Sequence, residues 1–172
     1  MPRLFFALLP DALVRAEIQA FADTLSLDGG RLVPELNTHI TLAFLGMVEE
    51  VTCDELITGA SLLRAAPFSL CLDSMTWWPK PKILCLAPSS YPDTLTRLAT
   101  DLHELSKECG VVLDGRPYNP HLTLARKIAV PHPDIRLESI SWNINEFCLV
   151  ESKPRENGVE YQVKVSWPLK IM

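Results

Sequence analysis

A seven-residue segment occurs twice in this chain of 172 residues. Residues 37–43 (NTHITLA) return as residues 119–125 (NPHLTLA), with five identical positions and an aliphatic exchange at a sixth. The separation of 82 residues is far longer than the roughly 20 to 50 residues of a solenoid repeat, and only two copies exist. The sequence therefore predicts a duplicated unit with one copy in each half of the chain.

The alternation within each copy predicts a β-strand with one polar and one apolar face. Successive side chains of a strand point to opposite faces, so His39 and Thr41 share one face, as do His121 and Thr123. Two residues along a strand span about 7 Å. The intervening aliphatic side chains would anchor each strand. If the two strands face each other, two imidazoles and two hydroxyls meet in one cleft.

That set of side chains suits an in-line displacement at phosphorus. One histidine can deprotonate the attacking oxygen and the other can protonate the departing one, because the imidazole pKa lies near neutrality. The hydroxyls can donate hydrogen bonds to the non-bridging oxygens. A single copy is more simply explained as a half-buried strand with a satisfied histidine. Two copies in equivalent places favour the catalytic interpretation.

The composition describes an ordinary globular protein of about one domain. Hydrophobic residues make up 48% and charged residues 22%, which excludes disordered, collagen-like and coiled-coil chains. The formal net charge of −5 argues against a non-specific grip on long nucleic acid, which depends on clustered lysine and arginine. A small or terminal phosphate remains compatible with this charge.

Hydrophobic periodicity predicts an α+β fold with two lobes in one body and helices outside largely antiparallel sheets. The helices are expected from Asp11 to before Gly29, at about 50–66 and at about 92–109. Strands are expected at about 3–9, 39–45, 68–75, 83–87, 121–126, 143–151 and 159–167.

The cysteines and the first residues indicate a cytoplasmic protein. The five cysteines are widely spaced, form no C-x-x-C pair and mostly lie in apolar runs, which is typical of buried thiols in a reducing cytosol. They also lack zinc-site spacing. Only six consecutive apolar residues precede Pro10, too few for a signal peptide or a membrane span.

The tetrapeptides at 39–42 (HITL) and 121–124 (HLTL) resemble the paired H-x-T-x motifs of the 2H phosphoesterase superfamily. Further segments resemble its bacterial and archaeal branch, the LigT-like RNA 2′,3′-cyclic phosphodiesterases, also called 2′-5′ RNA ligases. These segments follow the family's order over nearly the whole chain: RLFFAL at 3–8, TLAFLG at 41–46, RPYNPHLTLAR at 116–126, and Glu151-Ser152 with Gly158 and Tyr161.

The resemblance implies one bilobal domain over residues 1–172, with a pseudo-twofold axis, a central cleft, and no metal or other cofactor. It implies hydrolysis of a 2′,3′-cyclic phosphate to a 2′-phosphomonoester, with His39 as proton donor to O3′ and His121 as proton acceptor from water. Residue chemistry alone leaves these two roles interchangeable. Thr41 and Thr123 would hold phosphate oxygens.

The partners implied by the resemblance are RNA with a 2′,3′-cyclic phosphate end, tRNA halves or cyclic nucleotides. Reversible, ATP-independent 2′-5′ RNA joining, seen in the family, is a further expected activity. We expect a monomer without a membrane partner.

Arg126 and Phe44 each stand five residues after a motif histidine. An undistorted strand would turn both toward the apolar face. The resemblance supports Arg126 as a phosphate clamp, which requires a bulge or the strand's end to turn it inward; otherwise it is a solvated terminal residue. Phe44 is expected in the core unless the strand bends.

Four aromatic residues could stack on a nucleobase: Phe44, Trp77, Trp78 and Tyr118. For the tryptophan pair, packing in the core or at a lobe edge is the preferred interpretation.

Two other histidines are not expected in catalysis: His103, at a helix surface or boundary, and His132, in a loop. A metal site built on the motif histidines needs a third ligand, which no H-x-E or H-x-x-E-H arrangement supplies. The sequence also lacks a glycine-rich nucleotide loop, which argues against a kinase or an ATP-dependent ligase. Two alternatives to the leading hypothesis stay open. One is a non-catalytic binder of RNA ends or nucleotides, and the other is a metal-dependent hydrolase.

Overall fold

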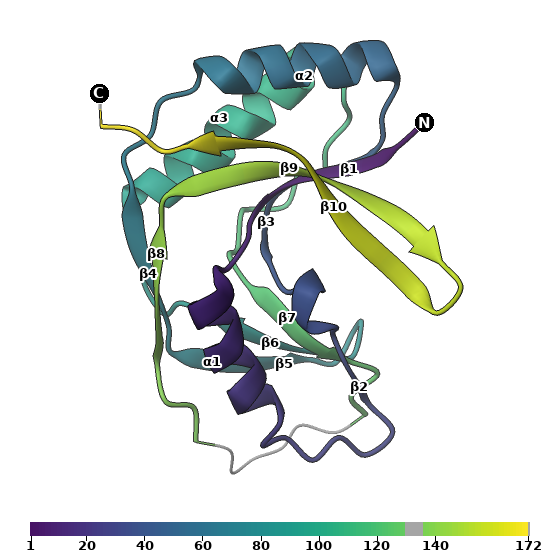
Figure 1. The fold of residues 1–172 in the computed structure, drawn as a ribbon, viewed down its shortest axis with the longest axis vertical. Coiled ribbons are helices and arrows are strands. Elements are labelled where there is room, and N and C mark those ends of the chain that lie inside the picture. The colour runs from purple at the N-terminus through teal and green to yellow at the C-terminus, as the bar shows by residue number, and fades with distance from the viewer. Residues whose placement is uncertain (130–135, 172) are drawn as a thin grey trace.

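The computed structural model describes residues 1–129 and 136–171 and is organised around an eight-stranded sheet (Figure 1). The strand order is β10-β9-β1-β3-β7-β6-β5, and β2 pairs with β7. Every strand pair is antiparallel among the described residues. The strands of this sheet are β1 (Arg3–Leu8), β2 (Arg31–Leu32), β3 (Ile40–Met47), β5 (Ser74–Trp78), β6 (Ile83–Ala87), β7 (Leu122–Arg126), β9 (Glu146–Arg155) and β10 (Gly158–Pro168). A separate two-stranded sheet contains β4 (Phe68–Leu72) and β8 (Ile140–Ile144).

The two copies of the repeat meet at the middle of the large sheet. β3 and β7 pair through Ile40 and Leu122, the residues that follow the two motif histidines. β1, β9 and β10 extend the sheet on the β3 side, whereas β6 and β5 extend it on the β7 side. The two sides of the sheet therefore meet at a narrow junction where the motifs lie, and each side contains strands from both halves of the chain.

Three helices cover the sheets: α1 (Ala12–Ala22), α2 (Glu50–Leu62) and α3 (Asp93–Glu108). Figure 1 shows α2 and α3 at one end of the molecule and α1 toward the other. α3 packs against β3 and α2, while α1 packs against β8. The predicted α+β fold with mostly antiparallel sheets is confirmed.

Helix α1 begins where the sequence predicts and ends earlier. The carboxylate of Asp11 accepts a hydrogen bond of 2.9 Å from the Val14 amide, which satisfies one of the free donors of the first turn. The helix ends at Ala22, and the Thr24 hydroxyl donates to the Phe21 carbonyl at 2.7 Å. Leu25 still packs against the core from the following turn, which explains why the apolar period continues beyond the helix.

The aliphatic residues of the repeat anchor both motif strands in the core. Ile40 and Leu122 are fully buried, and Leu42 and Leu124 are each 1% exposed. Burial of one such side chain contributes about 1.5 to 3 kcal/mol. The apolar face of each motif therefore fixes the strand, and its polar face is left for the cleft.

Two of the predicted strands are each divided between the two sheets. The segment predicted at 68–75 divides at Asp73 into β4 and β5, and the segment predicted at 143–151 divides at Asn145, between β8 and β9. Asp73 accepts two hydrogen bonds from Ser89, at 2.7 Å from the amide and 2.6 Å from the hydroxyl. The corners carry strand-like sequence on both sides, so periodicity cannot locate them.

All five cysteines are free, and three of them, Cys53, Cys85 and Cys148, are buried. Cys109 is partly exposed and Cys71 is exposed. The expectation of a buried thiol is wrong for Cys71, because its neighbours Leu70 and Leu72 take the inward positions of β4. Within the described ranges, no helix combines the length and the apolar character needed to span a membrane.

Candidate active site

A cleft of about 480 Å³ lies over the junction of β3 and β7, and all five residues predicted for the site line it. The β9–β10 hairpin, which extends beyond the rest of the sheet in Figure 1, contributes to its wall. The lining residues are Arg3, Phe5, His39, Thr41, Phe44, Ile83, His121, Thr123, Arg126, Ser152, Val159 and Tyr161.

Matching bulges in the two motif strands decide which side chains face this cleft. The pairing of β1 with β3 skips Leu42, and the pairing of β6 with β7 skips Leu124, at the same position of the repeat. A bulge inserts one unpaired residue and so reverses the alternation of the side chains that follow. The residues five after each histidine, Phe44 and Arg126, consequently turn into the cleft.

The bulges account for two open questions from the sequence. Arg126 reaches the cleft through a bulge and not only through the end of its strand. Phe44 is 51% exposed and does not lie in the core, because β3 bends. The guanidinium carbon of Arg3 lies 5.1 Å from the centre of the Phe44 ring, within the range of a cation–π contact.

The carbonyl of each bulged leucine has a hydrogen-bond donor from outside its own strand pair. The Nε2 of His103, on α3, donates to the Leu42 carbonyl at 3.1 Å. In the second copy the Val33 amide donates to the Leu124 carbonyl at 2.9 Å. A bulged residue leaves the strand ladder, so its carbonyl needs another donor when water is excluded. His103 is therefore a supporting residue of the first motif, which the sequence did not reveal.

Tyr118 supports the same bulge and does not line the cleft. Its hydroxyl donates to the Thr41 carbonyl at 3.2 Å, next to the carbonyl that His103 holds. Burial raises the pKa of the Tyr118 hydroxyl above its usual range, so it stays a donor at any physiological pH. The structure thus gives Tyr118 a supporting contact in place of base stacking.

The two motif histidines have the same orientation and the same tautomer. The Nδ1 of His39 lies 2.7 Å from the Asn37 carbonyl, and the Nδ1 of His121 lies 2.8 Å from the Asn119 carbonyl. A carbonyl oxygen can only accept, so each Nδ1 carries the hydrogen and each Nε2 is left for proton exchange. The asparagine of the repeat therefore supplies a backbone carbonyl that orients the imidazole ring and fixes its tautomer.

The first histidine lies in a more enclosed environment. The ring centres of Phe5 and Tyr161 lie 4.9 Å and 5.2 Å from that of His39, and its Nε2 is 3.1 Å from the Thr41 hydroxyl. Burial lowers the pKa of His39; the Asn37 carbonyl opposes this shift, and the charges of His121 and Arg126 add to it. The surroundings of His39 therefore favour its neutral form over the imidazolium.

The second histidine packs against a tryptophan. The ring centres of His121 and Trp78 are 4.5 Å apart, so Trp78 orients this imidazole as Phe5 and Tyr161 orient the first. The Thr123 hydroxyl lies 4.0 Å from the Cys85 thiol. Burial raises the pKa of Cys85 to about 11, so the thiol remains neutral beside the hydroxyl.

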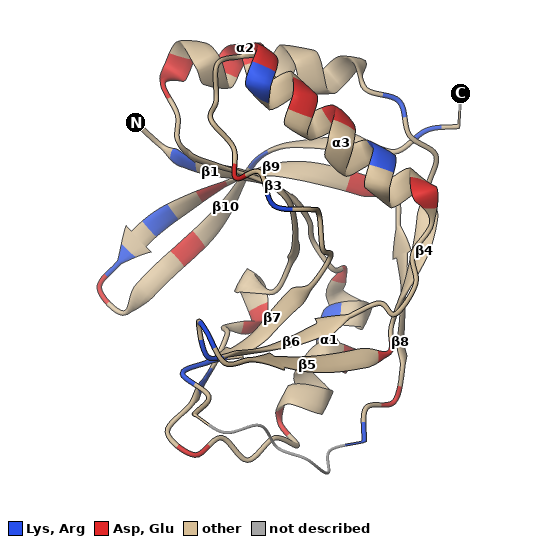
Figure 2. Ribbon diagram, turned by 180° about the vertical axis from the view of Figure 1, so that it is seen from behind, with Lys and Arg blue, Asp and Glu red and all other residues tan. Residues whose placement is uncertain are grey.

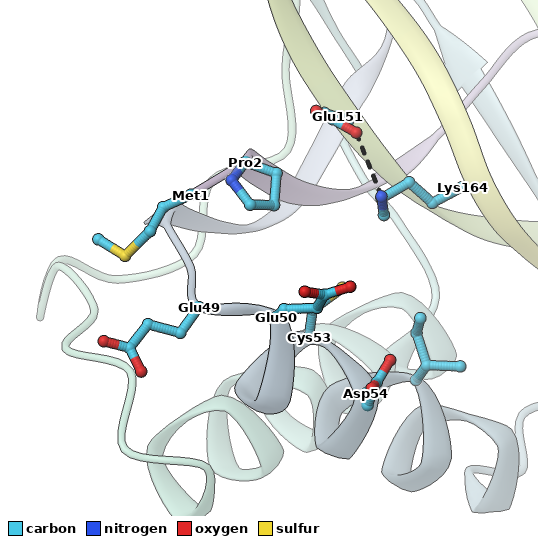
Figure 3. A pocket seen from close by; sticks show the side chains of 9 residues that line it. Met1, Pro2, Glu49, Glu50, Cys53, Asp54, Glu151 and Lys164 are labelled. Atoms are coloured by element: carbon cyan, nitrogen blue, oxygen red, sulfur yellow. Dashed lines mark hydrogen bonds and ion pairs between the residues drawn. The ribbon is translucent and has the colours of Figure 1, made fainter.

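The charge of the cleft is opposite to that of the whole chain. Arg3 and Arg126 line it, and the described lining contains no acidic side chain. A larger cavity of about 780 Å³ lies between the start of α2 and the strands β9 and β10 (Figure 3). Four carboxylates line that cavity, and its one lysine, Lys164, is paired with Glu151 at 3.2 Å. An anion is therefore favoured in the cleft and repelled from the larger cavity.

The fold and the cleft bring the two histidines of the repeat together, which is the arrangement expected from the resemblance to the 2H phosphoesterases. The family model of the 2′-5′ RNA ligase superfamily matches residues 9–156. The chain belongs to this superfamily.

Individual relatives cover almost the full chain. The RNA 2′,3′-cyclic phosphodiesterase of Escherichia coli (strain K12) is 31% identical over 172 residues, covering 97% of this chain and 96% of that protein. The protein of the same name from Thermus thermophilus is 32% identical over 182 residues, covering 98% and 90%. The crystal structure of E. coli LigT complexed with 3′-AMP superimposes with a TM-score of 0.92 at 30% identity and covers 99% of both chains.

Some cleft residues could not be assigned from the sequence. Arg3, Phe5 and Tyr161 come from β1 and β10, which sheet topology alone brings beside the motifs. His132, expected in a loop, lies outside the described residues.

Proposed function

We propose that this protein hydrolyses 2′,3′-cyclic phosphates of RNA ends and nucleosides to 2′-phosphomonoesters without a metal ion. The observation that supports this most directly is the pair of imidazoles in one cleft, each with Nδ1 held by a backbone carbonyl so that Nε2 is the nitrogen left for proton exchange; in His39 this Nε2 contacts the Thr41 hydroxyl. The relatives that match over nearly the full chain are named RNA 2′,3′-cyclic phosphodiesterases, which supports the substrate class and the bond cleaved.

In the proposed reaction His121 acts as base and His39 as acid. The Nε2 of His121 takes a proton from water, and the water oxygen attacks phosphorus. The P–O3′ bond breaks as the Nε2 of His39 gives its proton to O3′, and the phosphate stays on O2′. The hydroxyls of Thr41 and Thr123 and the guanidinium of Arg126 hold the non-bridging oxygens, where negative charge must be stabilised.

The acid role requires that His39 be protonated when substrate is bound. Burial lowers the pKa of His39 and so favours the neutral imidazole. A bound phosphodiester anion beside the ring acts in the opposite direction, because an opposite charge within about 4 to 6 Å favours the cationic form. Binding of the substrate therefore favours the protonated form of His39, which is the form that can act as the acid.

The same cleft supports RNA joining as a second reaction. The 5′-hydroxyl of another RNA takes the place of water, so a P–O5′ bond forms while the P–O3′ bond breaks and a 2′-5′ linkage results. RNA ends and tRNA halves are the proposed substrates of this joining reaction. The crystal structures of E. coli LigT with 3′-AMP and with ATP support a cleft that accepts nucleotides.

The five free cysteines support a location in a reducing compartment such as the cytosol.

The test uses an oligonucleotide with a 2′,3′-cyclic phosphate end in excess EDTA, with product analysis. The 2′-phosphate is the expected product, and replacing either His39 or His121 with alanine should lower the rate by about 10² to 10⁴. Exclusive formation of the 3′-phosphate, or an undiminished rate in His39→Ala, would contradict the proposal.

This assay, together with a measurement of 2′-AMP binding and the addition of metal ions after EDTA, separates the two alternatives. Tight binding of 2′-AMP with no turnover of any cyclic phosphate would indicate a binding protein. Loss of activity in EDTA with recovery on zinc or manganese would indicate a metal-dependent hydrolase.

A further inference from the structure

We propose that four basic side chains beside the cleft bind the phosphates of the RNA strand that leads to the cyclic end. These residues, which we call the basic rim, are Arg31, Lys80, Lys82 and Lys127. The inference rests on the proposed function and adds to it a preference for oligonucleotides over cyclic mononucleotides.

The rim comes from three segments that the fold brings to one place. Arg31 pairs with Arg126 between β2 and β7. The Ile128 amide, one residue after Lys127, donates to the Lys82 carbonyl at 3.0 Å, which joins the end of β7 to the turn between β5 and β6. The indole of Trp77 donates to the Ile128 carbonyl at 3.0 Å and holds this junction. Figure 2 shows blue segments gathered at this edge of the sheet.

The rim borders the cleft without lining it. Arg126 and Ile83 belong to the cleft wall, and they are the direct neighbours of Lys127 and Lys82. Adjacent Cα atoms are about 3.8 Å apart, so both lysine side chains start one residue outside that wall. A strand that leaves the cleft over this edge passes the rim at once.

Among the described residues, the positive charges of the rim have no ion-pair partner, although the protein as a whole is acidic. All four side chains belong to exposed residues, and none forms an ion pair with a described residue. Other basic residues, such as Lys107, Arg116 and Arg155, are paired with carboxylates. A phosphate at the rim therefore displaces no carboxylate of the described residues, in a chain whose formal net charge is −5.

Backbone strain coincides with two of these lysines. Lys82 has φ of 65° and Lys127 has φ of 58°, and they alone among the described non-glycine residues have positive φ. Glycine would adopt this left-handed conformation more easily, and strained residues concentrate at functional sites. Lysine at both positions is explained if the charged side chain is needed there.

The chemistry of the two substrate classes makes the inference testable. A nucleoside 2′,3′-cyclic phosphate has one phosphate, which occupies the cleft. An oligonucleotide has a further phosphate at every nucleotide, and flexible lysines bind such groups as point charges without reading the base. The rim should therefore lower KM for oligonucleotides only.

The experiment compares the double variant Lys82→Gln/Lys127→Gln with the unmodified protein on two substrates, 2′,3′-cyclic AMP and a short oligonucleotide with a cyclic phosphate end. KM for the oligonucleotide should increase by a factor of about 5 to 30, which is the effect expected from losing two exposed charge contacts. The dependence of log KM on log salt should weaken by about 0.7 for each lost phosphate contact. Hydrolysis of 2′,3′-cyclic AMP should stay within about twofold, since a surface substitution outside the cleft has a small effect.

The matched control is Arg97→Gln/Lys170→Gln, which removes the same charge from exposed residues away from the cleft. An equal increase in KM for the oligonucleotide in this control variant would overturn the proposal, because the net charge of the protein would then explain the effect without the rim. An equal loss on both substrates in the rim variant would also overturn it. If the unmodified protein hydrolyses neither substrate, the proposed function fails, and fluorescence anisotropy with a 2′-phosphate-ended oligonucleotide still decides whether the rim binds RNA.

Discussion

Replacing His103 with alanine tests whether a helix outside the cleft holds the first motif in its active shape. The imidazole donates at 3.1 Å to the carbonyl of Leu42, the bulged residue between Thr41 and Ala43. Loss of this donor leaves a carbonyl unsatisfied next to a core residue, which costs about 1 to 3 kcal/mol. For a domain of this size each kcal/mol lowers Tm by about 2 to 4 °C.

The same substitution should reduce activity more than its effect on stability alone would. If the bulge relaxes, the Thr41 hydroxyl and the Phe44 ring shift in the cleft, and a displacement of about 1 Å can cost up to about 10²-fold in rate. We expect a lower kcat with a smaller change in KM, measured with 2′,3′-cyclic AMP at a temperature well below Tm. His103→Gln keeps a side-chain donor and should recover part of the loss.

The control is Arg97→Ala, an exposed substitution on the same helix, which should change neither Tm nor kcat. A variant His103→Ala that loses stability but keeps its kcat would refute the positioning role. Full retention of both Tm and kcat would refute the hydrogen bond as well.

Two further predictions follow from the pKa of His39 and from the strained lysines. Burial lowers the pKa of His39 in the free enzyme, whereas a bound phosphate raises it. A general acid loses activity as the pH rises through its pKa. The alkaline limb of kcat/KM, which reports the free enzyme, should therefore lie at lower pH than the alkaline limb of kcat. Phe5→Leu reduces the burial of His39 and should move the alkaline limb of kcat/KM upward; movement of the acid limb instead would exchange the roles of His39 and His121. Lys127→Gly relieves a positive φ and should raise stability by about 1 kcal/mol, measured by urea unfolding, while it raises KM for the oligonucleotide. An unchanged free energy of unfolding in Lys127→Gly would show that this backbone carries no strain.

Much of the site follows from local sequence. The repeat at 37–43 and 119–125 predicts two strands with polar and apolar faces, and the structure places His39, Thr41, His121 and Thr123 in one cleft. These predictions succeed because alternation in a strand is a property of adjacent residues and because the copies share their burial pattern. The start of α1 at Asp11 is local for the same reason.

The corners and the partners of the motif strands required the tertiary structure. Asp73 and Asn145 divide predicted strands because β4 and β8 pair with each other, away from the large sheet. Phe5 and Tyr161 pack on His39 because β1 and the β9–β10 hairpin lie beside β3. Such contacts depend on residues far apart in the chain, which no local pattern encodes.

The bulges show most clearly where the sequence stops and the tertiary structure decides. By sequence alone Arg126 and Phe44 belong to the apolar face, and the identical Thr-Leu-Ala steps before them contain no turn residue that signals a bulge. The bulged carbonyls are held by His103 from α3 and by the Val33 amide, 61 and 91 residues away in the chain. The sequence by itself determined that each motif histidine and its threonine share the polar face of a strand, because the alternation of side chains along a strand is local. The inward turn of Arg126 was decided only by the fold, because the donor that stabilises an irregular strand comes from another element.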